Sequence, residues 1–403
     1  MSEHNITVQG GTSVRLLTAG KYCDRDILVT AEGGGIALDV ITASTLPDTV
    51  VDGQIVVITD TTPGTVYIDT DAPASPATGD VWVQVGAEAT AALTLTEESP
   101  YLRNGLVAAA QWNGNSWAYQ DGYLGVVGAW QQFAEGFPPV GTALNDMTWE
   151  QISAISAAGK AREYFSVGDA KRIVINGAIG NTNFSNVELC AFIIGLDHNS
   201  ELEGNNTIHF QLFMNNLAGG VKVCLTDSKY ASTTTSTGYY NMNTSNINTG
   251  GWQGCRMRTT TLGCNSSPSS PLEGSLLAAL PSDLRNVMRS INKYTNNTGG
   301  ATNSAAYVTN TIEFLWLLSE FEVYGVRKEA NSAEQNYQKQ YEYYSAGNNR
   351  VFYKYDATTT ASYWWLRSPC AANGYFCLGG TTGDAVNRDG AHTSYGIAPA
   401  FCV

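Results

Sequence analysis

The chain has 403 residues, enough for two or three domains, and 43% of them are hydrophobic, which excludes a disordered protein. Its formal net charge of −14 argues against a sequence-independent grip on nucleic-acid phosphates, which needs a basic face, and against docking on an anionic bilayer. No stretch approaches the 18 or so consecutive apolar residues that span a membrane, and the first residues lack a signal-peptide pattern. We therefore expect no nucleic-acid partner and no membrane insertion.

Residues 1–35 form the first predicted module, a small β unit. Alternating apolar residues predict three strands, at residues 6–9, 14–17 and 26–30. Gly10 and Gly11 separate the first two strands as a hairpin turn would. Residues 17–30 resemble a module found at the start of tail proteins of phages that infect gut Firmicutes. The resemblance implies that this end faces the phage particle and contacts other tail proteins.

Residues 36–137 form a second β-rich unit. Runs of β-branched residues predict strands at residues 49–58, 65–69 and 80–85. The pair Asn113-Gly114, between Gln111 and Trp117, predicts a further hairpin. Phage fibres often assemble such β modules as trimers, with their sheet edges buried between chains. We favour a homotrimer over a monomeric sandwich.

Residues 138–403 form the large domain. A helix is predicted to begin after Thr148 and to end near Gly159, and a second helical region, interrupted at Pro281, covers residues 271–291. Strands are predicted at residues 172–175, 188–195, 207–213, 313–319 and 350–355. Helices followed by loop-rich antiparallel strands indicate an α+β domain.

Side chains that could carry out chemistry are scattered. No nucleophile-elbow, phosphate-loop or metalloprotease motif occurs, and we expect no cofactor and no metal ion. We interpret His198 as part of a solvated turn and His209 as a polar-face strand residue. Glu320 and Glu322 are placed on one face of a strand, where they could pair with Arg256, Arg258 or Arg367. We interpret Arg367 as a buried structural cation. A calcium site at Asp69–Asp71 is less favoured than a turn.

Eight cysteines in 403 residues are too few for a disulfide-dense scaffold. None forms a C-x-x-C pair, so most are expected to be buried thiols, of which one or two could oxidise after release.

The most informative part of the chain is the stretch 370–395, which we call the variable segment. It contains no Glu, Lys, Gln, Met or Trp. These five types are those that a codon ending in a pyrimidine cannot encode, so randomised codons of that form would produce this alphabet. Two conserved-looking stretches enclose the segment, Trp364–Pro369 before it and Gly396–Phe401 after it. The pattern indicates a segment that is built to vary and is held in a frame that is not.

This frame, together with the Phe376-Cys377 pair, resembles the variable proteins of diversity-generating retroelements. In that family, reverse transcription mutates template adenines and scatters Asn codons into other residue types. The resemblance implies a C-type-lectin-like domain similar to phage tropism determinants. We therefore expect a multi-domain chain, with small N-terminal all-β modules followed by an α+β C-type-lectin-like domain.

The family also implies that the varied side chains bind the ligand. Phe376, Cys377 and Ala385 are assigned to the frame. The remaining ligand-binding positions are Cys370, Ala371, Ala372, Asn373, Tyr375, Leu378, Thr381, Thr382, Asp384, Val386, Asn387, Arg388, Asp389, His392, Thr393 and Tyr395. Tyrosine with Asn, Ser, Gly and Asp is the composition of an adaptable binding surface.

The resulting functional hypothesis is a phage receptor-binding protein of the tail tip or fibre. It would be part of the virion, after synthesis in the bacterial cytoplasm, and would bind a host surface protein or glycan. Three alternatives stay open at this point. The segment could be an ordinary loop-rich hairpin, or the protein could be a retroelement-diversified ligand-binding protein of a bacterium. An enzyme of the formylglycine-generating type, using Cys370 and Cys377, is disfavoured because a catalytic thiol could not survive at a varying position.

Overall fold

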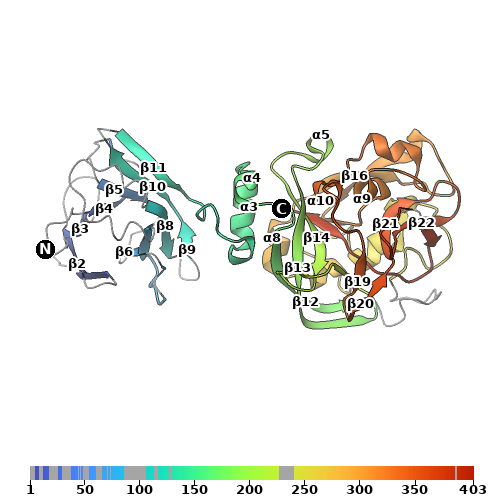
Figure 1. Ribbon diagram of the computed structural model, residues 1–403, viewed down its shortest axis with the longest axis horizontal. Helices are drawn as coiled ribbons and strands as arrows, with labels where there is room; N and C mark the ends of the chain where they lie inside the picture. Colours follow the sequence, from blue (N-terminus) through green and yellow to red (C-terminus); the bar gives the residue numbers. More distant parts are fainter. Residues whose placement is uncertain are drawn as a thin grey trace. The chain divides into compact units, whose positions relative to one another are not determined.

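The computed structural model describes residues 5–8, 12–17, 26–29, 38–43, 45, 47–48, 54–59, 66–69, 71–72, 74–85, 106–112, 117–126, 129–226, 240–385 and 388–403. The chain divides into two compact units, Met1–Gly141 and Thr142–Val403 (Figure 1). Both are built mainly from β-strands, and the helices are few and short. The predicted division near residue 35 stays a prediction. Among the described residues, no helix is long and apolar enough to cross a membrane.

The first unit contains two sheets. The larger has the order β1-β2-β3-β4-β5-β10-β11 and the smaller has the order β6-β7-β8-β9. The strands are β1 (Asn5–Val8), β2 (Thr12–Leu17), β3 (Asp26–Val29), β4 (Leu38–Ala43), β5 (Gln54–Ile58), β6 (Val66–Asp69), β7 (Val81–Val85), β8 (Leu106–Trp112), β9 (Trp117–Tyr119), β10 (Asp121–Val126) and β11 (Ala129–Glu135).

Two hairpins predicted in this unit are confirmed by the strand register. Strands β1 and β2 are antiparallel, with Ile6 opposite Val14. Strands β8 and β9 pair Trp112 with Trp117 around the predicted Asn-Gly turn, whose own residues lie outside the described ones. Apolar side chains on β5 and β7 are fully buried, among them Val56 and Val83. The alternating apolar residues therefore placed these strands correctly.

The predicted helix is present near the start of the second unit, as α3 (Trp149–Ala157). Thr148 caps it, because the Thr148 hydroxyl accepts from the N–H of Gln151 while the Gln151 side chain accepts from the N–H of Thr148. Trp149 and Ile152 on its apolar face are buried. The other helices are short: α4 (Ala161–Tyr164), α5 (Ser200–Glu203), α6 (Gly251–Gly254), α7 (Leu276–Ala279), α8 (Ser282–Val287), α9 (Glu320–Tyr324), α10 (Glu342–Ser345), the 3₁₀ turns η1 (Leu144–Asp146), η3 (Ala305–Tyr307) and η4 (Ser332–Asn336), and the π-helical turn η2 (Met257–Leu262).

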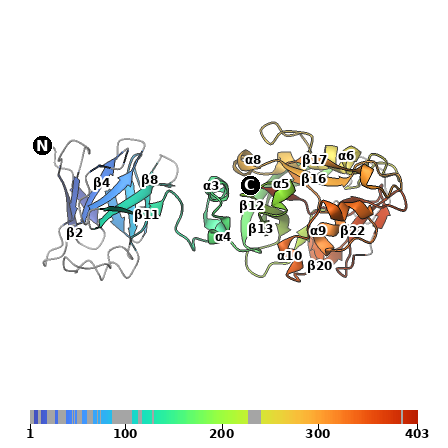
Figure 2. The ribbon, with the colours of Figure 1, turned by 90° about the horizontal axis from the view of Figure 1, so that it is seen from above.

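The core sheet of the second unit has the order β12-β13-β14-β24-β18 (Figures 1 and 2). Its strands are β12 (Ala170–Ile179), β13 (Thr182–Leu196), β14 (Ile208–Met214), β24 (Ala400–Cys402) and β18 (Leu315–Trp316). The last strand of the chain thus lies inside the sheet, between β14 and β18. Phe401 stacks on Phe210 with ring centroids 5.1 Å apart. The C-terminus is therefore part of the core.

Three small sheets complete the unit, with orders β15-β19-β20, β16-β17 and β21-β22-β23. Their strands are β15 (Val223–Cys224), β16 (Ile291–Asn296), β17 (Val308–Glu313), β19 (Phe352–Lys354), β20 (Ala357–Ser362), β21 (Trp364–Pro369), β22 (Tyr375–Gly379) and β23 (Arg388–Gly390). The β21-β22-β23 sheet carries the variable segment.

Two predicted elements of this unit were wrong in part. Ile291 opens strand β16 instead of closing a helix, because the helix ends at Val287 and Met288 is already extended. The strand predicted over residues 313–319 is divided, and Glu320 and Glu322 lie in helix α9 instead of on one face of a strand. The reason is a capping box: the Ser319 hydroxyl accepts from the N–H of Glu322, and the Glu322 carboxylate accepts from the N–H of Ser319.

Candidate functional site

The frame around the variable segment is buried, as the sequence predicts. Trp364, Trp365 and Phe401 are inaccessible to solvent. The indole N–H of Trp365 donates to the carbonyl of Tyr240 at 3.0 Å, and the backbone N–H of Trp365 donates to the carbonyl of Gly396 at 2.9 Å. The two ends of the segment are therefore tied to each other and to the core.

Close contacts explain why two positions at this frame are glycine. A Cβ at Gly379 would lie 2.0 Å from the indole nitrogen of Trp364, and a Cβ at Gly396 would lie 2.3 Å from Sγ of Cys224. Atoms cannot approach so closely, so any side chain at either position would displace the buried neighbour. Both glycines keep the hairpin pressed against the aromatic frame.

The variable segment contributes strands β22 and β23 to a three-stranded antiparallel sheet, whose remaining strand, β21, belongs to the frame. Tyr375 pairs with Gly390, and Trp365 pairs with Leu378. Most of the predicted ligand-binding side chains reach solvent. Those that are exposed or partly exposed are Ala371, Ala372, Asn373, Tyr375, Thr381, Thr382, Asp384, Arg388, Asp389, His392 and Tyr395. Val386 and Asn387 lie outside the described residues.

Three predicted positions are buried instead. Cys370 is inaccessible to solvent, and Leu378 and Thr393 are 3% and 5% exposed. Cys370 sits where the end of β21 meets the loop at Ala330, and Leu378 lies opposite the buried Trp365. A ligand cannot contact these side chains in this structure. The composition of the segment could not show this, because alternation along such short, irregular strands does not fix which side faces the core.

Polar contacts hold the exposed side chains of the segment in place. The Tyr395 hydroxyl donates to the Asp389 carboxylate at 2.5 Å, and the Thr382 hydroxyl donates to Asp384 at 2.6 Å. Arg388 pairs with Glu329, which belongs to the loop after helix α9. A surface of tyrosines and hydrogen-bonding groups with restrained rotamers loses little entropy when it binds a partner.

The two thiols of the segment offer little chemistry. Sγ of Cys370 and Sγ of Cys377 are 3.9 Å apart, and both residues are buried and reduced. Burial raises the pKa of Cys377 well above its ordinary value, and the neighbouring Cys370 raises it further. A thiol that stays protonated is a poor nucleophile. Of the cysteines that the structure describes, all seven are free and buried, as predicted.

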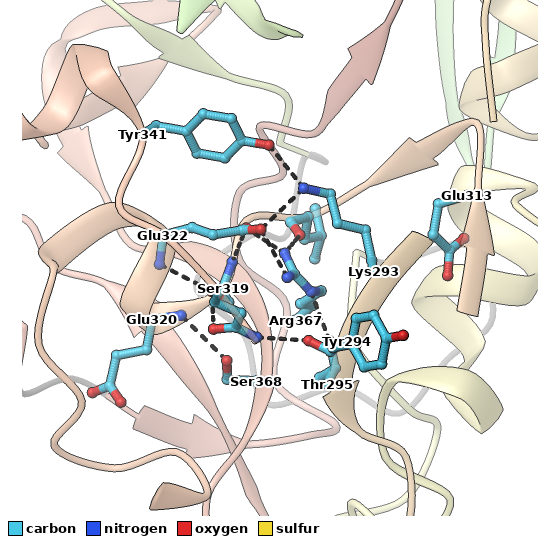
Figure 3. Close-up of polar contacts among 12 residues, drawn as sticks. Lys293, Tyr294, Thr295, Glu313, Ser319, Glu320, Glu322, Tyr341, Arg367 and Ser368 are labelled. Carbon is cyan, nitrogen blue, oxygen red and sulfur yellow. Dashed lines mark hydrogen bonds and ion pairs between the residues drawn. The ribbon is translucent and has the colours of Figure 1, made fainter. Parts of the chain in front are cut away.

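The frame residue Arg367 belongs to a buried ion cluster with Glu322, Lys293 and Glu203. Figure 3 shows Arg367, Glu322 and Lys293 of this cluster. The Arg367 guanidinium donates to both carboxylate oxygens of Glu322 and, through Nε, to the Thr295 hydroxyl at 2.7 Å. The Lys293 ammonium lies 2.8 Å from Glu203 and 3.1 Å from Glu322. Arg367 is therefore a buried structural cation, as predicted.

Electrostatics divides the acidic side chains near this cluster into two kinds. Burial would raise the pKa of Glu322, but Arg367 and Lys293 outweigh burial and hold that pKa well below its usual range. Burial raises the pKa of Glu203 to about 7 against the opposing effect of Lys293, and burial likewise raises the pKa of Glu334 to about 7. Glu334 accepts hydrogen bonds from the N–H of Asn296 and the hydroxyl of Ser368, at 2.9 and 2.6 Å.

Both histidine interpretations were wrong about exposure: His198 lies in a turn and His209 in a strand, as predicted, but both side chains are buried. His198 is 7% exposed and stacks on Tyr341 at 3.7 Å between ring centroids, so it does not lie in a solvated turn. His209 is fully buried in strand β14, with Nδ1 at 3.0 Å from the Tyr341 hydroxyl. This burial could not be predicted from the sequence, because the partner Tyr341 lies more than 130 positions away along the chain.

The ligand atoms of His198, Glu203 and Glu322 approach one another closely enough to hold a metal ion. The Lys293 ammonium already bonds both carboxylates there, and a cation would have to displace it. Burial lowers the pKa of His198 to about 3, which keeps the ring neutral. These residues fit a lysine-filled polar core better than a metal centre.

Comparison with known proteins identifies one region of similarity. Residues 228–403 match the model of a domain of unknown function (DUF6273), which covers less than half of the chain. The match contains the frame, the variable segment and Lys293, Glu322 and Arg367. No curated protein matches the chain, and no solved structure does. The functional argument therefore depends on the geometry of the site.

Proposed function

We propose that this protein is a receptor-binding protein of a phage tail tip or fibre. The second unit would be a C-type-lectin-like domain of the kind found in the variable proteins of diversity-generating retroelements. One observation carries the proposal: the sequence stretch with a randomisable alphabet displays most of its side chains, while the stretches that enclose it are buried in the core. Such a domain can change its surface residues without changing its fold.

The other parts of the proposal concern assembly. The first unit would dock on the particle through residues 1–35, and three copies of the chain would form a homotrimer. Three copies would present the binding surface three times and raise avidity without new contacts. The ligand would be a molecule on the host cell surface.

The binding test compares three purified proteins for adsorption to intact cells. The first is the wild type and the second replaces Tyr375, Arg388 and Tyr395 together with Ala. The third is a control that replaces Arg172 and Tyr307, two exposed residues of the same unit outside the segment. The cells would be a panel of gut Firmicutes strains, screened first with fluorescently labelled wild type.

We expect the triple variant to lose adsorption and the control to keep it. Because the Tyr395 ring packs at 5.3 Å from that of Trp365, a double variant that retains Tyr395 separates loss of binding from loss of folding. Unchanged adsorption by a folded triple variant would refute the site assignment.

The retroelement origin has a separate test at the DNA level. A near-copy of the codons for 370–395 should lie close to a reverse-transcriptase gene, with AAC or AAT at the varied positions. Portal and tail genes beside it would support a phage protein, whereas host metabolic genes would indicate a bacterial ligand-binding protein.

A further inference from the structure

A loop outside the variable segment lies against it. This loop, Asn243–Asn248, is held by hydrogen bonds at both ends. The N–H of Asn243 donates to the carbonyl of Ala391 at 2.8 Å. At the other end, the Asn248 side chain donates to the carbonyls of Asn373 and Tyr375 at 3.0 and 2.8 Å. The loop and the segment therefore keep one relative position.

Asn248 is itself fixed from the opposite direction. It is 1% exposed, and its side-chain oxygen accepts from the N–H of Gly300 at 2.7 Å. Its side chain thus joins the segment to a third part of the unit. A buried amide whose donors and acceptor are all used is a rigid connection, because opening it would leave buried polar groups without partners.

Two glycines of the segment lie against the loop, and at Gly390 only a glycine fits. A Cβ at Gly374 would lie 3.5 Å from the carbonyl oxygen of Asn246 and 3.8 Å from Cα of Ile247. A Cβ at Gly390 would lie 2.3 Å from the side-chain oxygen of Asn246. The backbone of Ile247 therefore lies beside the turn that precedes Tyr375.

Ile247 is unusual for its exposure. Its side chain is 51% exposed, although isoleucine is one of the residues most often buried. The backbone carbonyl of Ile247 accepts a hydrogen bond from the Asn243 side chain at 2.8 Å, which fixes the backbone of the loop. An apolar side chain is thus held in solvent, on a rigid loop, next to the displayed residues of the segment.

A second loop with a fixed position also meets the segment. The carbonyl of Glu329 accepts from the N–H of Ala371 at 2.8 Å, and its carboxylate pairs with Arg388. The Glu320 carboxylate accepts hydrogen bonds from the backbone N–H groups of Lys328, Glu329 and Ala330 at 2.9 to 3.1 Å. Glu329 is therefore a positioning residue for Arg388.

We infer that the ligand-binding surface is composite: Ile247, which the retroelement would not vary, contacts the ligand together with the displayed residues of the variable segment. This inference rests on the proposed function. Ile247 would supply apolar contact area to every variant of the segment, while the varied side chains would select the partner.

The chemistry of the surface favours a protein as the partner. The charge of Arg388 is compensated by Glu329, and the Asp389 carboxylate accepts a hydrogen bond from the Tyr395 hydroxyl. Protein interfaces have few uncompensated charges at their centre and are rich in tyrosine. An aliphatic side chain such as Ile247 matches an apolar side chain of another protein. It offers a glycan neither a hydrogen bond nor an aromatic face.

The test uses adsorption of labelled protein to the same intact cells. The variant Ile247→Ser removes the apolar contact, and Ile312→Ser is the matched control because Ile312 is 61% exposed and lies in β17, outside the segment and its two flanking loops. We expect Ile247→Ser to weaken adsorption about tenfold, the range expected for a central apolar contact. The control should bind as the wild type does.

Two treatments of the cells identify the chemical class of the partner. Proteinase K should abolish adsorption, and periodate oxidation of glycans should leave it unchanged. Loss of adsorption after periodate alone would overturn the assignment to a protein. Wild-type adsorption by Ile247→Ser would overturn the composite surface. If Ile247→Ser adsorbs as the wild type does while the triple variant of Tyr375, Arg388 and Tyr395 does not adsorb, the proposed function stands and this inference fails.

Discussion

The second unit uses charged side chains in two different ways, and the contrast separates its core from the surface that we propose for ligand binding. In the buried ion cluster, Arg367 and Glu322 are inaccessible to solvent and bonded several times. In the variable segment, Arg388 has a side chain that is 40% exposed and pairs with one carboxylate, that of Glu329. A buried ion pair is expensive to break, whereas an exposed pair contributes little to stability. We therefore expect sequence change to be tolerated in the variable segment and to be damaging in the buried ion cluster.

The largest expected effect comes from breaking the buried cluster. Arg367→Met should reduce the free energy of unfolding by about 3–5 kcal/mol, because it leaves the Glu322 carboxylate buried beside only one cation. Urea denaturation of the whole chain would measure this, followed through the tryptophan fluorescence of the second unit. A loss below about 1 kcal/mol would contradict the structural role assigned to Arg367.

A smaller loss is expected at the glycine against the frame. Gly379→Ala would place a methyl group against the Trp364 ring and should cost about 1–3 kcal/mol by overpacking. Gly254→Ala is the matched control, since a Cβ there meets no atom within 4 Å. Thermal melting of both variants compares them directly. Equal melting temperatures would show that the Trp364 contact does not hold the hairpin.

The raised pKa of Glu334 predicts a pH effect of intermediate to small size. The pKa is about 7 in the folded chain and about 4.5 when unfolded, so between these values the folded state binds more protons. The stability that protonated Glu334 contributes is complete below pH 4.5 and is lost as the pH rises through 7. Glu334→Gln should remove this loss. The free energy of unfolding of the variant, measured relative to that of the wild type, should therefore be higher at pH 8 than at pH 5 by on the order of 1 kcal/mol or more. Denaturation curves of both proteins at both pH values would measure this change. The same difference in free energy of unfolding at pH 5 and pH 8 would contradict the prediction, because it would mean that Glu334 is ionised throughout.

The smallest effect on stability is expected at Arg388, a residue whose replacement should weaken binding. Arg388→Ala should change the free energy of unfolding by less than about 0.5 kcal/mol, because a surface ion pair is screened by solvent. The same variant should adsorb more weakly to cells. A destabilisation as large as that of Arg367→Met would abolish the distinction between the two regions.

Local pattern predicted much of the fold. Thr148 and the apolar spacing of Trp149 and Ile152 located helix α3, and alternating residues located most described strands of the first unit. In the second unit they located β12, β13, β14 and β19 and left most of the small strands unpredicted. The pattern failed where two signals compete. Ser319 and Glu322 form a capping box within a run that is apolar enough to be a strand, and the hydrogen bonds of the cap determine the outcome.

The candidate site shows the same division. The alphabet of residues 370–395 and the aromatic residues around it could be recognised from the sequence, since they are properties of a contiguous stretch. The sequence could not show that Cys370, Leu378 and Thr393 are buried, or that Ile247 lies beside the segment. These facts depend on contacts between residues far apart in the chain.

The sequence by itself determined which stretch has an alphabet that can vary, where the aromatic frame encloses it, and which local elements form. Only the tertiary structure decided which side chains of the variable segment reach solvent and which residues from outside it lie beside them. It also brought Lys293, Glu322 and Arg367 together from three separate elements. The physical reason is that codon usage, caps and alternation act within a few residues. Burial and ion pairing depend on distances in space, which only the folded chain defines.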